Sequence, residues 1–225
     1  MTCKHFNWKY TMKTLKVPYI PDLEKMTYGQ LDMAMETGAA KSWTGEACWP
    51  ETFPYHPDTT FAVARSSTHI AVLYHVRCLD LRAMALEDNG AVWEDSCCEF
   101  FISDPEDGTY YNFEMNCIGT LLGAKRRSRK DCTHFAPERL ADVKRHSTLA
   151  RKQHDLSGKI FGWSVAMVVP FSMIGIDPEN LPASVRANFY KCADKSAHPH
   201  FLAWNRVDTP APDFHRPDFF GELTF

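Results

Sequence analysis

The sequence predicts an all-β protein, a two-sheet antiparallel β-sandwich with short helical insertions. From residue 60 onward, short stretches alternate apolar and polar side chains, turn signals separate them, and no long helices intervene between them. At 225 residues the chain is long enough to bury a large core without disulfide or metal staples. We therefore expect one domain over residues 1–225, with residues 1–14 as a peripheral N-terminal extension.

The first half of the chain leads from a helix into a hairpin. Residues 22–36 are compatible with a helix, and residues 42–58 form a long loop rich in aromatic residues and proline. Residues 60–65 and 69–77 alternate in polarity on either side of the polar turn 66–68. That pattern is typical of a β-hairpin, so we expect the first sheet to start there.

The second half repeats the strand and turn pattern. Residues 96–103 form a strand that ends at the turn 104–108, and residues 109–118 form the next one. The basic segment 125–130 is expected to be a solvated loop, and residues 171–176 a short helix or turn. Further strands are expected at residues 159–169, 184–192, 200–207 and 221–225.

Composition excludes several classes of protein. The net charge of −3 gives no bulk attraction to nucleic acid or to an anionic membrane. No apolar run reaches the length of a membrane span. Residues 1–10 are not followed by an apolar segment of the secretory type, so the sequence favours a cytoplasmic protein. A periplasmic or extracellular location is expected instead if a signal peptide has been removed.

The eight cysteines have no regular spacing and no CxxC pair. We expect free thiols, several of them on apolar strand faces, in a reducing compartment. Cys97 and Cys98 are adjacent in a strand, so their side chains point to opposite faces and make a poor chelating pair.

Polar side chains share faces of three predicted strands. In residues 109–118 one face is apolar, whereas the other carries Asn112 and Glu114. Glu99 is the only charged residue in residues 96–103, and Arg186 shares a strand face with Asn188. If these strands are neighbours, their polar groups could converge on a hydroxyl-rich ligand, because a sugar hydroxyl both donates and accepts hydrogen bonds. A solvated sheet face with salt bridges is the alternative.

Aromatic residues next to this polar face could complete a sugar site, because apolar sugar faces stack on aromatic rings. Trp93 lies in a loop directly before residues 96–103 and is a candidate stacking platform. Phe214, His215 and Arg216 lie in a proline-bounded loop near the C-terminus. Trp163 and Trp204 fall within predicted strands and are expected in the core.

These segments resemble the family 9 carbohydrate-binding modules, accessory domains of xylanases. The resembling stretches run from about residue 15 to the end and include the sequences around Trp93, Tyr110, Arg186 and Phe214. The chain is similar also to the stand-alone family 9-like proteins of gut Bacteroidetes, whose pattern runs through YYNFE, NFYKC and PDFHRPDFFG. The resemblance implies a β-sandwich that binds mono- or disaccharide units between two aromatic rings.

The resemblance also implies roles for individual residues. Trp93 matches the first clamp aromatic of the family, and Glu99 matches a carboxylate that binds sugar hydroxyls. Phe214 stands where the family has its second clamp Trp, and Glu114 stands where the modules have a ligand-binding Arg. Arg216 or Arg186 could replace that missing cation. The two departures imply that the ligand differs from that of the xylanase modules, or that sugar binding has been lost.

Family members carry structural calcium, so the resemblance implies that a calcium ion could be bound. Asp104, Glu106 and Asp107 in the turn after residues 96–103 offer hard oxygen ligands. An ordinary acidic turn is the alternative interpretation.

Three other functions have to be considered. Glu99 and Glu114 could form the carboxylate pair of a weak glycoside hydrolase. A metal site could be built from His and Cys side chains (His198, His200, His215 and Cys192). A β-sandwich could also be a protein-interaction module, using exposed aromatic residues such as Trp43, Trp49 and Tyr55.

The sequence therefore predicts non-catalytic binding of a mono- or disaccharide unit of a plant-type polysaccharide, xylan- or glucan-like. Trp93 and Phe214 would stack on the ring, and the polar residues of the strands would bind its hydroxyls. The resemblance implies a glycoside hydrolase as the partner in polysaccharide breakdown.

Overall fold

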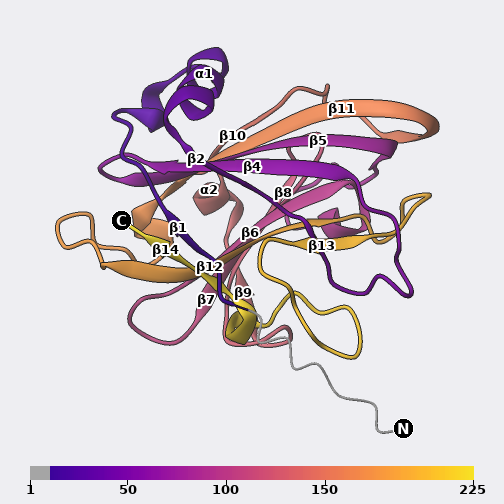
Figure 1. Cartoon of the computed structure of the whole chain (residues 1–225). Helices are drawn as coiled ribbons and strands as arrows, with labels where there is room; N and C mark the ends of the chain where they lie inside the picture. The colour runs from indigo at the N-terminus through magenta and orange to yellow at the C-terminus, as the bar shows by residue number, and fades with distance from the viewer. Residues whose placement is uncertain (1–10) are drawn as a thin grey trace, which may run out of the picture.

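Two β-sheets pack face to face and confirm the predicted β-sandwich (Figure 1). The computed structural model describes residues 11–225, so most of the predicted N-terminal extension and Cys3 lie outside the described residues. Thr14 already belongs to a strand, and the carbonyl of Lys13 accepts a hydrogen bond from the amide of Glu222 at 2.9 Å. From residue 13 onward the chain is therefore part of the sheet.

The larger sheet has nine strands, seven of them in the order β1-β14-β12-β6-β7-β8-β9, with β13 paired to β12 and β3 paired to β13. Its strands are β1 (Thr14–Lys16), β3 (Glu46–Ala47), β6 (Cys97–Ser103), β7 (Tyr110–Asn116), β8 (Leu121–Arg126), β9 (Cys132–His134), β12 (Ser184–Cys192), β13 (Phe201–Ala203) and β14 (Gly221–Thr224). All the pairings are antiparallel except that of β1 with β14, which is parallel.

The smaller sheet has five strands in the order β10-β11-β5-β4-β2. They are β2 (Ala40–Trp43), β4 (Asp58–Arg65), β5 (His69–Ala83), β10 (Lys144–Ser147) and β11 (His154–Pro170). The predicted hairpin of β4 and β5 is confirmed, with Arg65 opposite Ile70. The long strands β5 and β11 run side by side along the top of Figure 1.

One apolar core fills the space between the sheets. It includes Phe61, Tyr74 and Val165 from the small sheet and Phe100 and Phe113 from the large one, all at most 1% exposed. Trp163 and Trp204 belong to this core, as predicted. The core thus takes up the inward face of β6 and β7, so their other face is directed away from the small sheet.

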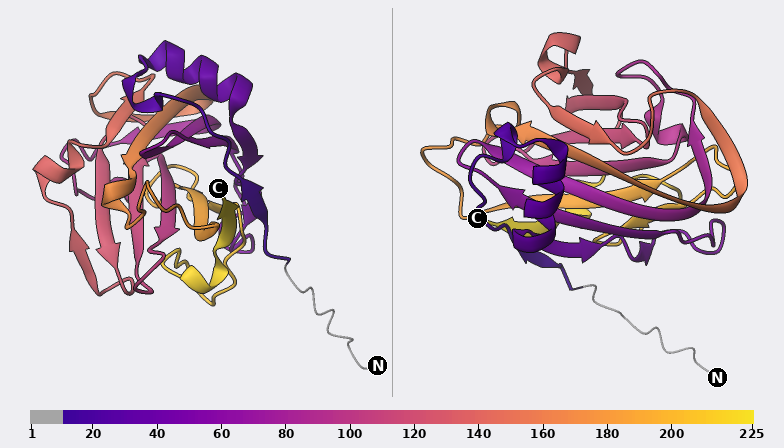
Figure 2. Two further views of the ribbon diagram at one scale, coloured as in Figure 1. Left: turned by 90° about the vertical axis from the view of Figure 1, so that its left-hand side faces the viewer. Right: turned by 90° about the horizontal axis from the view of Figure 1, so that it is seen from above.

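Helix α1 (Tyr28–Gly38) covers the outer face of the small sheet, as the two views of Figure 2 show. Thr27 and Gln30 form a capping box at its start, and Leu31 and Met35 pack on the small sheet. The predicted helix over residues 22–36 is thus divided into η1 (Leu23–Lys25) and α1. The remaining short helices are η2 (Val92–Glu94), α2 (Pro137–Leu140), η3 (Phe171–Met173) and η4 (Pro217–Phe219).

The outer face of the large sheet carries a second apolar cluster rather than open solvent. Phe101 and Tyr190 from the sheet pack against Phe214 and Phe220 of the C-terminal segment. Arg186 fastens this segment, because its guanidinium donates to the carbonyls of Phe220 and Gly221. The C-terminal segment therefore covers part of the outer sheet face, and a cavity lies beside this segment.

The predicted solvated loop at residues 125–130 is partly wrong. Lys125 and Arg126 are the last residues of β8, which pairs with β7. Gly123 interrupts the apolar and polar alternation of this strand, and a Cβ there would meet Leu140 at 2.8 Å and Phe135 at 2.9 Å. Close packing therefore requires glycine at this position. The glycine breaks the alternation of apolar and polar residues, which is why the sequence pattern did not predict the strand.

The predicted free thiols are confirmed for the cysteines that the structure describes, since all seven are unpaired and six of them are buried. Over residues 11–225, no helix is long and apolar enough to cross a bilayer.

Candidate functional site

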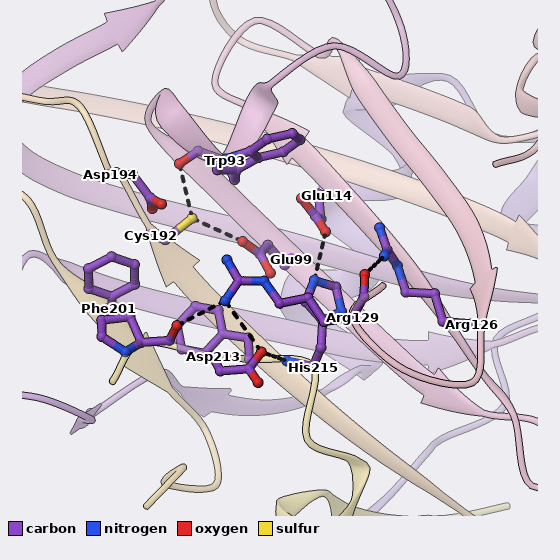
Figure 3. A pocket seen from close by; sticks show the side chains of 12 residues that line it. Trp93, Glu99, Glu114, Arg126, Arg129, Cys192, Asp194, Phe201, Asp213 and His215 are labelled. Atoms are coloured by element: carbon purple, nitrogen blue, oxygen red, sulfur yellow. Dashed lines mark hydrogen bonds and ion pairs between the residues drawn. The ribbon is translucent and has the colours of Figure 1, made fainter. Parts of the chain in front are cut away.

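A cavity of about 350 Å³ opens on the outer face of the large sheet, beside the C-terminal segment (Figure 3). Strands β6, β7, β8, β12 and β13, helix η2 and the C-terminal loop all contribute to its wall. Its lining residues are Trp93, Glu99, Glu114, Arg126, Arg129, Cys192, Asp194, Phe201, Pro212, Asp213, Phe214 and His215. Four predicted site residues are brought together here: Trp93, Glu99, Glu114 and Phe214.

Trp93 lies at one side of the cavity in the short helix η2, which hydrogen bonds hold in place. The buried carboxylate of Asp95 accepts the amides of Met84 and Ala85 at 2.9 and 3.0 Å and the side-chain amide of Asn116 at 3.0 Å. The carbonyl of Trp93 accepts the amide of Asp194 at 3.1 Å. With 39% of its surface exposed in such a fixed position, the indole offers a stacking face to a ligand.

Phe214 also lines the cavity but is only 8% exposed. Its ring stacks on Tyr190 with centroids 4.1 Å apart and contacts Trp49 and Phe201. Because one ring face is already packed on Tyr190, Phe214 offers a ligand far less surface than Trp93 does.

Two carboxyl groups, those of Glu99 and Glu114, form the floor. They lie directly opposite each other on the paired strands β6 and β7, and each residue is 3% exposed. Glu99 Oε1 accepts the thiol of Cys192 at 2.9 Å, and Glu114 Oε1 accepts the amide of Asn112 at 2.8 Å. Burial and the charge of Glu114 raise the pKa of Glu99 well above its usual range. Burial raises the pKa of Glu114 to about 7, against the opposing effects of Arg126 and Asn112.

The arginines lie on one side of this floor. Arg126 Nε donates to Asn112 Oδ1 at 2.6 Å, and its Nη1 donates to the carbonyl of Arg129 at 2.8 Å. Arg129 reaches over the cavity to the carbonyl of Pro212 at 3.3 Å and to Asp213 at 3.9 Å. The amide of Asn112 therefore connects the Arg126 guanidinium to the Glu114 carboxyl.

His215 lies between the arginines and the floor. Burial and the charges of Arg126 and Arg129 lower the pKa of its ring to about 3, so the ring is neutral at neutral pH. Its Nδ1 lies 3.1 Å from the Tyr110 hydroxyl, and its Nε2 lies 4.0 Å from Glu114 Oε1. A neutral ring that accepts from Tyr110 presents an N–H toward Glu114, which makes this contact a dipolar one and not an ion pair.

The other predicted binding residues do not line the cavity. Asn112 is fully buried below it, and Asn188 is fully buried with its side chain bonded to the backbone of Asn205. Arg186 holds the C-terminal segment, and Arg216 is paired with Asp218 and lies over the Phe219 ring. Neither Arg186 nor Arg216 supplies the cation that is absent at position 114, because both are committed to the C-terminal segment.

The predicted calcium ligands do not fit a cation. Asp104 and Asp107 already share the ammonium of Lys125, at 3.0 and 2.7 Å. Asp104 also accepts the Tyr111 hydroxyl at 2.6 Å, and Glu106 is exposed beside them with its own amide bonded to Asp104. With a lysine in the position that a metal would take, these residues form an ion-paired turn.

Among the described residues, the His and Cys side chains proposed for a metal site do not converge on one point. His200 accepts from Lys191 Nζ at 2.8 Å, and His198 lies beside Asp80, whereas His215 lies in the cavity. Within residues 11–225, one set of three such side chains does converge: Cys97, Glu99 and Cys192 have ligand atoms within 4.8 Å of one another. Burial raises the pKa of Cys97 to about 12 and that of Cys192 well above its usual range. Both groups are thus thiols, and Cys192 serves as a hydrogen-bond donor to Glu99.

The exposed aromatic residues considered for a protein interface have different surroundings. Trp43 is 64% exposed on β2 in the small sheet. Trp49 packs beside the cavity on Phe201 and Phe214, and its indole N–H donates to the carbonyl of Thr209 at 2.6 Å. The Tyr55 hydroxyl accepts the amide of Leu79.

Five charged or polar cavity residues were not predicted as binding residues: Arg126, Arg129, Asp194, Asp213 and His215. Arg126 could have been predicted, because β8 pairs with β7 and places Arg126 on the same sheet face as Asn112 and Glu114. Arg129, Asp194 and Asp213 lie outside strands, and a period of two carries no information about such positions.

The fold and the cavity together define a ligand-binding β-sandwich with an aromatic wall and a carboxyl floor. The chain belongs to carbohydrate-binding family 9, whose model matches residues 30–225. A solved protein from Bacteroides uniformis, a candidate carbohydrate-binding protein, has 33% sequence identity and a TM-score of 0.86, covering 96% of this chain and all of its own. The search of curated proteins gave no match.

Family 9 modules of Caldicellulosiruptor kristjanssonii, solved with glucose and with cellotriose, share the fold. Their TM-scores are 0.55 and 0.54 at 14% and 13% identity, and the matches cover 94% of this chain and 95% and 93% of theirs.

Proposed function

We propose that this chain binds a mono- or disaccharide unit of a plant-type polysaccharide, xylan- or glucan-like, without transforming it. The observation that carries the proposal is the exposed Trp93 indole beside a cavity floored by Glu99 and Glu114 (Figure 3). The indole suits the apolar face of a pyranose ring, and the carboxyl groups suit its hydroxyls. Family membership and the glucose and cellotriose complexes of the modules from C. kristjanssonii support it.

The protein would hold saccharide ends for a glycoside hydrolase partner. The unpaired thiols favour a reducing compartment, which supports the cytoplasmic location expected from the sequence. A periplasmic or extracellular location remains the alternative if a signal peptide has been removed.

Calorimetric titration with glucose, xylose, galactose, cellobiose and xylobiose tests the proposal. Competition with water limits affinity, so we expect a dissociation constant of about 1 µM or weaker. Trp93→Ala should weaken binding by about 10- to 100-fold, which corresponds to about 1–3 kcal/mol.

Trp43→Ala is the matched control, because it removes an exposed indole from the other sheet and should leave the affinity unchanged. Equal binding by the wild type and Trp93→Ala would exclude the stacking role. No heat from any sugar would overturn the proposed function.

Glycoside hydrolysis is a second candidate function, favoured by the direct opposition of Glu99 and Glu114. Residues opposite each other in an antiparallel pair have Cβ atoms about 5 Å apart, which is compatible with the carboxyl spacing of a retaining enzyme. Analysis of the cellobiose and xylobiose samples for released monosaccharide tests it. Cleavage that is lost in both Glu99→Gln and Glu114→Gln would make the protein an enzyme, and intact disaccharide would exclude hydrolysis of these substrates.

A further inference from the structure

The floor of the cavity holds an excess of acidic groups. Glu99 and Glu114 form it on β6 and β7, and Asp194, which follows β12, lines the cavity with them. Within residues 11–225, Glu99 and Glu114 have only uncharged hydrogen-bond partners, a thiol and an amide, and the Asp194 carboxylate has no ion pair. Three carboxyl groups thus face one small space without direct contact to a cation.

The cations that border the cavity are committed elsewhere. Arg126 donates to Asn112 and to the carbonyl of Arg129. Arg129 is at the rim, with 62% of its side chain exposed, next to Asp213 and Pro212. His215 is neutral because burial and these two arginines lower its pKa. In the described part of the chain, neither arginine therefore makes a hydrogen bond or ion pair to Glu99, Glu114 or Asp194.

The pKa values of these three acids are all raised. Burial and the Glu114 charge raise the pKa of Glu99, burial raises that of Glu114 to about 7, and burial raises that of Asp194 to about 6. Arg129 opposes the shift at Asp194 and Glu114, and Lys191 opposes it at Glu99 and Asp194, whereas Glu94 adds to it at Asp194. Among the described residues, no lining cation thus bonds directly to these acids, and the raised pKa values favour their protonated forms in the absence of a ligand.

We infer that the preferred ligand is an amino sugar, a pyranose that carries a free ammonium group. The inference rests on the proposed function and specifies its ligand class. The ammonium would occupy the floor between Glu99 and Glu114 while the ring stacks on Trp93, and it would replace protons that are then released to solvent. An ammonium donates three hydrogen bonds and accepts none, which suits carboxylate oxygens. A uronic acid would bring a fourth carboxylate to the same floor.

Titration with glucose, glucosamine, N-acetylglucosamine and glucuronic acid tests the inference, because the four share one ring. At about pH 6 an amine of α-amino type is protonated. Glucosamine should then bind about tenfold tighter than glucose, since charge-assisted hydrogen bonds replace neutral ones. Acetylation of the amine should remove the preference.

Proton release gives a second readout. In two buffers of different ionisation enthalpy, the heat of glucosamine binding should differ because protons leave Glu99 and Glu114, whereas the heat of glucose binding should not. Glu114→Gln should reduce the ratio of the two affinities toward one and reduce the proton release. Asp107→Asn is the control, because that acid lies in the ion-paired turn and does not line the cavity.

The outcomes separate the two proposals. If glucose binds as tightly as glucosamine, or glucuronic acid binds tighter than both, the ligand class is wrong and sugar binding stands. If none of the four sugars and no member of the neutral panel binds, the proposed function fails with it.

Discussion

Two acidic clusters lie near the same strand, β8: the turn with Asp104 and Asp107, and the cavity floor with Glu99 and Glu114. Two consecutive basic residues of β8 interact with them, one directly and the other through a neutral amide. Lys125 and Arg126 point to opposite faces of the sheet because side chains alternate along a strand. Lys125 contacts Asp104 and Asp107 directly, and hydrogen bonds and this ammonium lower the pKa of both. Arg126 reaches Glu114 only through the amide of Asn112, and the pKa of Glu114 is raised.

The difference separates a structural acid from a binding acid. A carboxylate in direct contact with a lysine and with backbone amides has few lone pairs left for a ligand. A carboxyl group that is linked to a cation only through a neutral amide has no direct partner for its negative charge. It can therefore still bind a cationic or hydrogen-bond-donating ligand in the cavity. The sequence offers both clusters as candidate ligand sites, and the surrounding contacts favour the strand pair.

Removing the amide between Arg126 and Glu114 should have the largest effect. Asn112→Leu leaves Glu114 Oε1 and Arg126 Nε without their partner in a buried place. We expect a loss of about 3–4 kcal/mol in the free energy of unfolding. Urea denaturation measures it, with Asn112→Asp as a second variant that retains an acceptor for Arg126. A loss below about 1 kcal/mol for the leucine variant would show that the amide does not link the two charges.

The pH dependence of stability should carry the opposite sign for the two clusters. The pKa of Glu114 is higher in the folded state than in the unfolded chain, so its contribution is fully present below the unfolded value and is lost as the pH rises through about 7. Because His215, with a lowered pKa, titrates with the opposite sign, the effect has to be measured as a difference between variants. We expect the stability difference between the wild type and Glu114→Gln to fall by about 2–3 kcal/mol from about pH 5 to about pH 8. Asp104 and Asp107 act in the other direction, because their lowered pKa values give stability that is lost as the pH falls through the acid range.

The stability difference between the wild type and the double variant Glu99→Gln/Glu114→Gln should change more with pH than that of Glu114→Gln alone, because the pKa of Glu99 is also raised. Denaturation midpoints of these variants across pH measure the effect. A stability difference between the wild type and Glu114→Gln that stays constant or rises from about pH 5 to about pH 8 would contradict the raised pKa of Glu114.

The sequence predicted the strand faces better than their surroundings. Alternation places Glu99 and Glu114 on one face of β6 and β7, and Trp93 directly before β6, so three cavity residues follow from pattern alone. The same alternation placed Asn112 and Asn188 in the site, because it cannot tell a lined cavity from a buried support. That distinction depends on the C-terminal segment, which covers Asn188 and part of the sheet through long-range packing.

The direct ion pair of the turn should have the smallest effect, because it lies at the surface. Lys125→Met removes the ammonium but leaves Asp104 with the Tyr111 hydroxyl and the amide of Glu106. Because 38% of the Lys125 side chain is exposed, solvent screens the pair, and we expect a loss of about 1 kcal/mol at neutral pH. The loss should shrink in acid as Asp104 becomes protonated. Lys41→Met, which breaks an exposed pair with Glu36, is the control and should cost less.

Sugar affinity should be unchanged in Lys125→Met, since Lys125 does not line the cavity. A weaker affinity would show that the two faces of β8 are coupled, and the separation between structural and binding acids would then fail.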